Sequence, residues 1–137
     1  MKRFLSLLIL AALSSAPLAA RPQFKATTPE LRLQAAQDYL HNQPNQLAIY
    51  AKGFVCSSCG IGLRIHLKKL DSVDQQHFDK GVLMDASKQL LIVAFEADAE
   101  VSIDAVRDAV YSAGYDPEHY YQWNGESVDM RLFPAAK

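Results

Sequence analysis

Apolar residues repeat with two different periods along the chain, and the changes of period divide it into helices and strands. Helical spacing predicts amphipathic helices over residues 29–41, 58–70 and 102–113. Alternating or unbroken apolar runs predict strands over residues 47–52, 78–85, 89–96, 120–123 and 127–133. The run Leu90–Phe95 is apolar throughout, which is typical of a central strand covered on both faces.

Capping and turn residues support these boundaries. Thr28–Glu30 combines a hydroxyl N-cap, a proline at the first helical position and an acid in the first turn. Ser102 is a second N-cap, and Gly114 is placed to end the helix that follows it. Asn124 and Gly125 predict a two-residue type I′ turn between the last two strands.

The element order predicts an α+β fold. Its core reads βαββαβ, the order of a ferredoxin-like sandwich with four antiparallel strands and both helices on one face. An N-terminal helix and a C-terminal β-hairpin strand are added to this core. The N-terminal helix should pack on the rest of the fold, because a broad apolar arc is formed by Leu31, Leu33, Ala35, Ala36, Tyr39 and Leu40.

The first twenty residues have the composition of a secretory signal peptide. Lys2 and Arg3 form a positive segment, Phe4–Leu13 is apolar but too short to span a bilayer, and small residues lead to a cleavage site after Ala20. We therefore expect an exported protein, periplasmic or secreted, with no stable membrane span after cleavage. The expected organisation is a signal peptide (1–20), a disordered lead with an accessory amphipathic helix (21–45), the main domain (46–123) and a C-terminal extension (124–137).

Composition limits the classes of partner. Loss of Lys2 and Arg3 with the leader leaves 12 basic residues against 15 acidic ones, a net charge of −3. A mildly acidic chain without a basic cluster argues against nucleic acid as a partner. The remaining 117 residues are enough for one domain with a single core.

Cys56 and Cys59 are the two cysteines of the chain and form a Cys-x-x-Cys motif between a strand and a helix. The start of the following helix would favour the thiolate form. Two thiolates at this spacing can bind one soft metal ion, such as Cu(I), Ag(I) or Hg(II), or they can oxidise to a disulfide. Zinc normally takes four ligands, and the spacing of His66 and His77 from Cys59 completes no usual zinc pattern.

A group of residues resembles the heavy-metal-associated domain family, which includes periplasmic mercury-binding proteins and bacterial copper chaperones. Gly53–Cys59 matches the metal loop of the family, with Phe54 and Val55 in place of its methionine and threonine. The leucines that follow match its first helix, and Ala113–Tyr115 matches the exit of its second. The family's helix leucines are matched by Leu63, Leu67 and Leu70.

This resemblance implies an exported soft-metal-binding protein and not an enzyme. It places the metal on Cys56 and Cys59, with no catalytic residue and no other cofactor site. Cu(I) or Hg(II) is the expected metal, with Ag(I) and Zn(II) as further candidates. The metal would be sequestered, or transferred to a transporter or another acceptor protein. By position, Phe54 should pack inward and Tyr115 should lie beside the metal loop.

Two alternatives stay open at this point. A thiol-disulfide oxidoreductase shares the exported Cys-x-x-Cys, but thioredoxin-like folds need a proline facing the dithiol, and none lies between Pro44 and Pro117. A metal-free interaction module with a structural disulfide is the other. Ile61 and Ile65 fall on the outer side of the second helix, and we expect another part of the chain to cover them.

Overall fold

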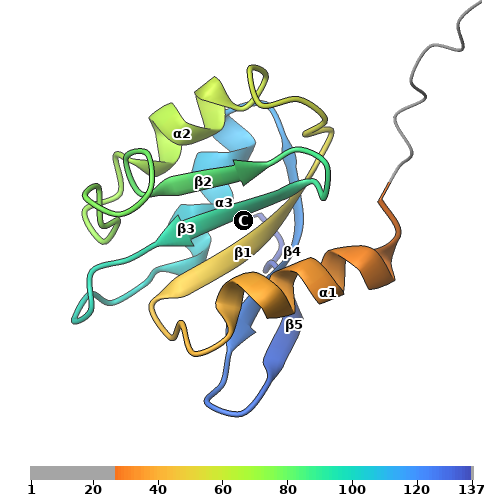
Figure 1. The fold of residues 1–137 in the computed structure, drawn as a ribbon. Coiled ribbons are helices and arrows are strands. Elements are labelled where there is room, and N and C mark those ends of the chain that lie inside the picture. The colour runs from red at the N-terminus through yellow and green to blue at the C-terminus, as the bar shows by residue number, and fades with distance from the viewer. Residues whose placement is uncertain (1–26, 137) are drawn as a thin grey trace, which may run out of the picture.

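The computed structural model describes residues 27–136, which contain a five-stranded antiparallel sheet with helices on both faces (Figure 1). The strand order is β2-β3-β1-β4-β5, so the four core strands have the ferredoxin-like order and β5 extends the sheet beside β4. The expected α+β fold is confirmed. The elements are α1 (Pro29–Leu40), β1 (Gln46–Lys52), α2 (Ile61–Leu67), β2 (Val82–Asp85), β3 (Leu90–Ala94), α3 (Ile103–Ser112), β4 (Asp116–Trp123) and β5 (Val128–Leu132). The expected signal peptide lies outside the described residues.

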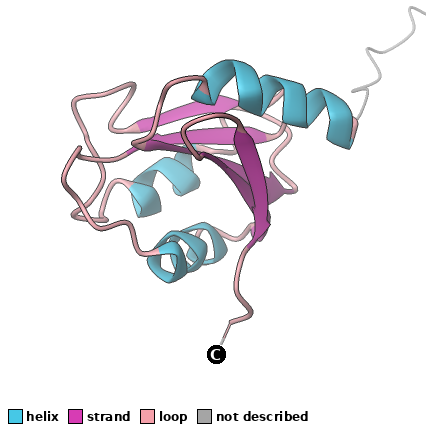
Figure 2. Cartoon of the chain, turned by 90° about the horizontal axis from the view of Figure 1, so that it is seen from below, coloured by secondary structure: helices cyan, strands magenta, loops and turns pink. Residues whose placement is uncertain are grey.

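The sheet separates two apolar layers, because successive side chains of a strand point to opposite faces. On β1, Leu47 and Ile49 pack in the layer beneath α2 and α3, whereas Ala48 packs in the layer beneath α1. Strand β3 alternates in the same way, with Leu91 in the first layer and Ile92 in the second. Figure 2 shows α1 alone on one side of the sheet and the other two helices on the opposite side. The prediction that the apolar run at β3 is covered on both faces is confirmed.

Helix α1 begins as the sequence predicts, since the Thr28 hydroxyl accepts a hydrogen bond from the Leu31 backbone N–H. Its buried face is nevertheless rotated from the predicted apolar arc. Leu31 is 52% exposed, whereas Arg32 is 5% exposed and faces the sheet. Ala36 and Leu40 are fully buried against the sheet, as expected. Within residues 27–136, no helix is long and apolar enough to cross a membrane.

Two predicted elements are shorter in the structure. Helix α2 begins at Ile61 and not near Ser58, with Gly60 as its N-cap, so Cys59 precedes the helix. Strand β2 begins at Val82 and not at Phe78. Phe78 has a φ of 52°, a left-handed conformation that an extended strand excludes.

The hairpin between β4 and β5 forms, but its turn differs from the predicted type I′ turn. Asn124 donates its backbone N–H to the Ser127 carbonyl, so the two central residues are Gly125 and Glu126. Gly125 has a φ of 105°, while Asn124 uses its side-chain oxygen to accept from the N–H groups of Glu126 and Ser127. Asn124 is therefore the first residue of the turn and not one of its two central residues, and its side chain caps the N–H groups that follow.

Candidate metal centre

The cysteine loop begins with a tight turn at the end of β1. Gly53 has a φ of 91°, which side chains with a Cβ rarely adopt, and the Phe54 N–H donates to the Ala51 carbonyl at 3.1 Å. Phe54 is fully buried in the layer beneath α2 and α3, as the resemblance to the metal-binding family implied. The turn and this buried ring hold the start of the loop, while Val55 after it is 47% exposed.

Cys56 and Cys59 are joined by a disulfide, with their Cα atoms 5.3 Å apart. Cys59 is exposed and Cys56 is half-buried. The Cys59 backbone N–H lies 3.2 Å from the Cys56 carbonyl and 3.3 Å from its Sγ, and the Ser58 hydroxyl is 3.7 Å from the same sulfur. The two sulfur atoms therefore lie together in a surface turn whose N–H and O–H groups face one of them.

Tyr115 contacts the cysteine loop at Cys59 and at Phe54. Its hydroxyl donates to the Cys59 carbonyl at 2.6 Å, and its ring meets the Phe54 ring edge-on, with centroids 6.4 Å apart. The residue follows α3, where the Gly114 φ of 88° turns the chain back toward the sheet. The expected position of Tyr115 beside the cysteine loop is confirmed by this contact.

Gly60 forms the close contact beneath the loop. A Cβ at this position would collide with the Met84 sulfur and would lie 2.7 Å from the Phe54 ring. The loop thus rests on Met84, a half-buried residue of β2. Sequence reasoning missed this support, although a glycine directly after Cys59 was a signal for close approach.

The histidines contribute no further ligand set. Within the described residues, no group of three or more His, Cys, Asp or Glu side chains is arranged to hold a metal ion. His66 is half-buried on α2. His77 meets the Phe78 ring edge-on, and its Nε2 lies 3.4 Å from the Gln46 side-chain nitrogen. The loop therefore presents a pair of sulfur donors without a third protein ligand from residues 27–136.

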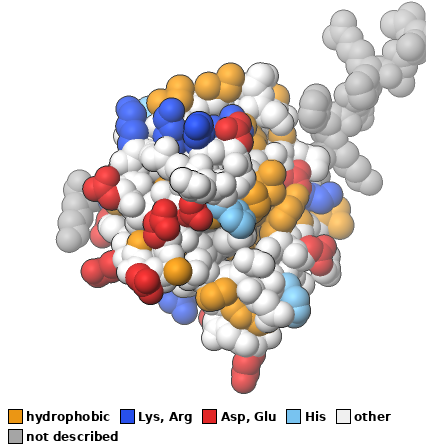
Figure 3. All heavy atoms as spheres, turned by 60° about the vertical axis from the view of Figure 1, so that its left-hand side comes forward, with side chains coloured by type: hydrophobic (Ala, Val, Ile, Leu, Met, Phe, Trp, Pro, Cys, Tyr) orange, Lys and Arg blue, Asp and Glu red, His pale blue; other side chains and the backbone are white. Residues whose placement is uncertain are grey.

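The outer surface of α2 is apolar and basic. Ile61 is 54% exposed and Ile65 is 42% exposed, so the expected cover by another part of the chain is wrong for residues 27–136. The cause is topological, because α1 packs on the opposite face of the sheet and β5 lies at the far edge. Figure 3 shows hydrophobic and basic side chains side by side along the top of one face, with acidic side chains below.

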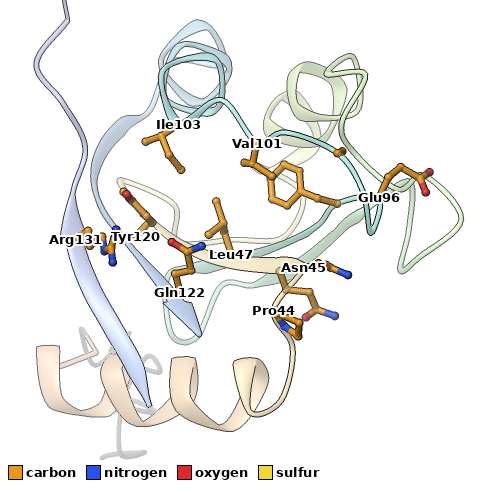
Figure 4. Close-up of a pocket in the computed structure, with 12 residues that line it drawn as sticks. Pro44, Asn45, Leu47, Glu96, Val101, Ile103, Tyr120, Gln122 and Arg131 are labelled. Carbon is orange, nitrogen blue, oxygen red and sulfur yellow. The ribbon is translucent and has the colours of Figure 1, made fainter. Parts of the chain in front are cut away.

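A separate hollow lies at the opposite end of β1 from the cysteine loop (Figure 4). It has a volume of about 400 Å³, and Leu47, Ile103, Tyr120 and Arg131 are among its lining residues. Its lining includes neither cysteine, so this hollow is not part of the candidate metal centre.

Neither a family model nor a curated protein matches the chain. The yeast copper transporter domain Ccc2a, solved in solution in its apo and Cu(I)-loaded states, has a similar structure. The match has 17% sequence identity and a TM-score of 0.42, and it covers 53% of this chain and 89% of that domain. The Cu(I)-loaded state belongs to the yeast domain.

Proposed function

We propose that this protein binds one soft metal ion, Cu(I) or Hg(II), through the sulfur atoms of Cys56 and Cys59. The observation that carries the proposal is the pair of neighbouring sulfurs in an exposed turn, held from below by Phe54 and from the side by Tyr115. Soft cations prefer thiolate ligands, and both metals accept two of them.

Metal binding requires the reduced form of the loop. Two electrons and two protons from a cellular dithiol convert the disulfide to two thiols, and the dithiol becomes a disulfide. Metal binding then displaces both thiol protons, because the thiolate is the ligand. The disulfide is thus the oxidised form of the same site.

Low coordination number fits a transfer role. A metal held by two sulfurs at an exposed turn leaves room for a thiol of an acceptor protein or metal transporter to attack. Sequestration without an acceptor is the simpler form of the same function. Export to the periplasm or the medium remains part of this proposal, and its support is the composition of residues 1–20.

Soft monovalent or linear-coordinating ions fit the donor set better than zinc does. Ag(I) shares the thiolate preference of Cu(I), so it should bind the same pair. Zn(II) normally takes four ligands in structural sites, and the described residues offer no cluster that completes such a set.

The first prediction concerns the two cysteines. Reduced protein should bind one Cu(I) per chain in an anaerobic titration against a chromophoric chelator, and Cys56→Ser or Cys59→Ser should lower the affinity at least about 100-fold, because one of two ligands is lost. Ser57→Ala, an exposed change in the same turn, is the matched control and should bind like the wild type. Equal stoichiometry and affinity in the serine variants would refute metal binding at this site.

The disulfide supports thiol-disulfide exchange as a second candidate function. An oxidoreductase would use the exposed Cys59 or its partner to form a mixed disulfide with substrate. Catalysed reduction of a model protein disulfide by the reduced chain, at rates well above those of free dithiol, would favour this candidate. Metal binding without faster reduction of the model disulfide would favour the metal-binding function.

A further inference from the structure

Arg32 is a buried arginine on the face of α1 that packs on the sheet, and it is 5% exposed. Its Nε donates to the Lys88 carbonyl at 3.2 Å, and Nη2 donates to the Gln89 side-chain oxygen at 3.1 Å. The Tyr50 ring lies beneath it, with 3.6 Å between the guanidinium carbon and the ring centroid. Neutral groups thus account for all these contacts.

Among the described residues, no carboxylate forms an ion pair with this charge. Within residues 27–136, the ion pairs closer than 4.0 Å involve other cations, and Arg32 is in none of them. Residues 1–26 contain no Asp or Glu. Buried charges in proteins are normally paired, because moving an ion out of water is unfavourable unless an opposite charge compensates for the lost hydration. Within residues 27–136, the Arg32 guanidinium is therefore buried without a directly paired carboxylate.

A cavity of about 580 Å³ lies at this arginine, which is one of the residues that line it. This volume is within the usual range for small-molecule sites, about 300–1,000 Å³. The polar part of the lining includes His119 and Tyr121, which share a hydrogen bond of 2.9 Å. Burial and the nearby Arg32 charge lower the pKa of His119, so its ring favours the neutral form. The apolar part of the lining includes Pro29, Leu33 and Met130.

The acids around the cavity restrict the ligand. Glu118 lines it and forms a 3.3 Å ion pair with Lys52, and Glu30 lies in the first turn of α1. These two carboxylates would repel a multiply charged anion such as phosphate, whereas one carboxylate on the guanidinium adds a single compensated charge. The aromatic and aliphatic walls favour an apolar body attached to that carboxylate.

We propose that this cavity is a binding site for a small monocarboxylate with an aromatic or branched apolar body, whose carboxylate pairs with Arg32. The site is formed by α1, β1, β4 and β5, so it depends on the two elements added to the ferredoxin-like core. It involves neither cysteine and stands independently of the metal-binding proposal.

The test uses the chain that remains after any leader cleavage, in its oxidised, metal-free form, with 2-naphthoate as the probe. Titration followed by ¹H–¹⁵N NMR should give saturable shifts at Tyr50, His119 and Tyr121. The neutral isostere 2-naphthamide and inorganic phosphate should each bind at least about tenfold more weakly, because one lacks the charge and the other lacks the apolar body. Equal affinity for naphthoate and naphthamide, or no saturable shift at these residues, would overturn the proposal.

Three variants sharpen this test. Arg32→Gln should weaken naphthoate binding at least tenfold, and Lys69→Gln, an exposed cation away from the cavity, should leave it unchanged. Because Arg32→Gln changes a buried residue, Met130→Trp provides a second route. Met130 is 57% exposed at the cavity, so a larger ring there should block the site without unfolding the chain. Unchanged naphthoate affinity in folded Arg32→Gln or in Met130→Trp would refute the assignment.

Discussion

One hydroxyl group ties the cysteine loop to the layer that contains α3. The Tyr115 hydroxyl donates to the Cys59 carbonyl at 2.6 Å, across a sequence separation of 56 residues. The backbone hydrogen bonds of the loop itself are short-range: Phe54 donates to Ala51, Cys59 to Cys56 and Gly60 to Ser57. This tyrosine therefore limits how far the loop can move when the disulfide opens.

Removal of that hydroxyl should loosen the loop while both cysteines stay in place. Tyr115→Phe should lower the free energy of unfolding by about 0.5–1.5 kcal/mol, the usual net value of one hydrogen bond, as measured by urea denaturation of the oxidised protein. The Cu(I) stoichiometry of the reduced variant should stay at one. Tyr111→Phe is the matched control, because Tyr111 is 71% exposed on α3 and should lose almost nothing. Equal effects of the two changes would contradict the role given to Tyr115.

At the scale of elements, α1 determines which apolar surface the molecule leaves open. The helix covers the face of the sheet opposite α2 and α3, where it packs on Ala48, Ile92 and Tyr121. Because α1 lies there, it cannot cover Ile61 and Ile65 on the outer side of α2. The helix closes one face of the sheet and contributes one wall of the cavity at Arg32.

Two leucines of α1 test its packing. Leu40→Ala should lower the free energy of unfolding by about 2–5 kcal/mol, because Leu40 is fully buried and its loss leaves a cavity against the sheet. Leu31→Ala should change it by no more than about 0.5 kcal/mol, because Leu31 is 52% exposed on the same helix. Thermal or urea unfolding measures both. A small loss for Leu40→Ala would show that α1 does not pack as described.

At the scale of the whole molecule, two apolar layers stabilise the fold on either side of one sheet. The disulfide joins residues three positions apart within one surface turn and does not connect the layers. It therefore restricts the unfolded chain only slightly, since the entropy gained by a cross-link grows with the length of the closed loop. The fold should not depend on the redox state of the cysteines.

Reduction is accordingly predicted to leave the protein folded. A phosphine reductant should lower the free energy of unfolding by about 2 kcal/mol or less, the chain-entropy value for a four-residue loop. Urea denaturation with and without reductant measures this difference. The Cys56→Ser/Cys59→Ser double variant should have the same free energy of unfolding with and without reductant. It therefore controls for effects of the reductant itself. Unfolding on reduction would contradict both this prediction and the metal-binding proposal.

Much of the fold could be predicted because local patterns and long-range packing agree. Thr28 and Ser102 cap their helices as expected, since a side-chain oxygen at an N-cap needs only its own helix. Prediction failed where two local signals competed. At Phe78 an aromatic residue indicated a strand, but the left-handed backbone there belongs to the turn before β2.

At the cysteine loop, only the closeness of the two cysteines and the position of Tyr115 were predictable. Cys56 and Cys59 are close in sequence, so their spacing alone brings the sulfurs together. The support of the loop by Met84 was not predictable, because β2 meets the loop only after the sheet and α2 have packed. The redox form in the structure, a disulfide, was one of the two outcomes that the motif left open.

The amino-acid sequence by itself determined the element types, their βαββαβ succession along the chain and the paired cysteines, because each depends on residues within a few positions of one another. Tertiary structure alone decided that α1 lies on the face away from α2, which leaves Ile61 exposed and buries Arg32. From the sequence alone, a charged residue in a helix, such as Arg32, is expected to face solvent. Only the surface on which the helix packs shows that it is buried. That surface, with the Tyr50 ring beneath the guanidinium, comes from a strand that only folding brings to the helix.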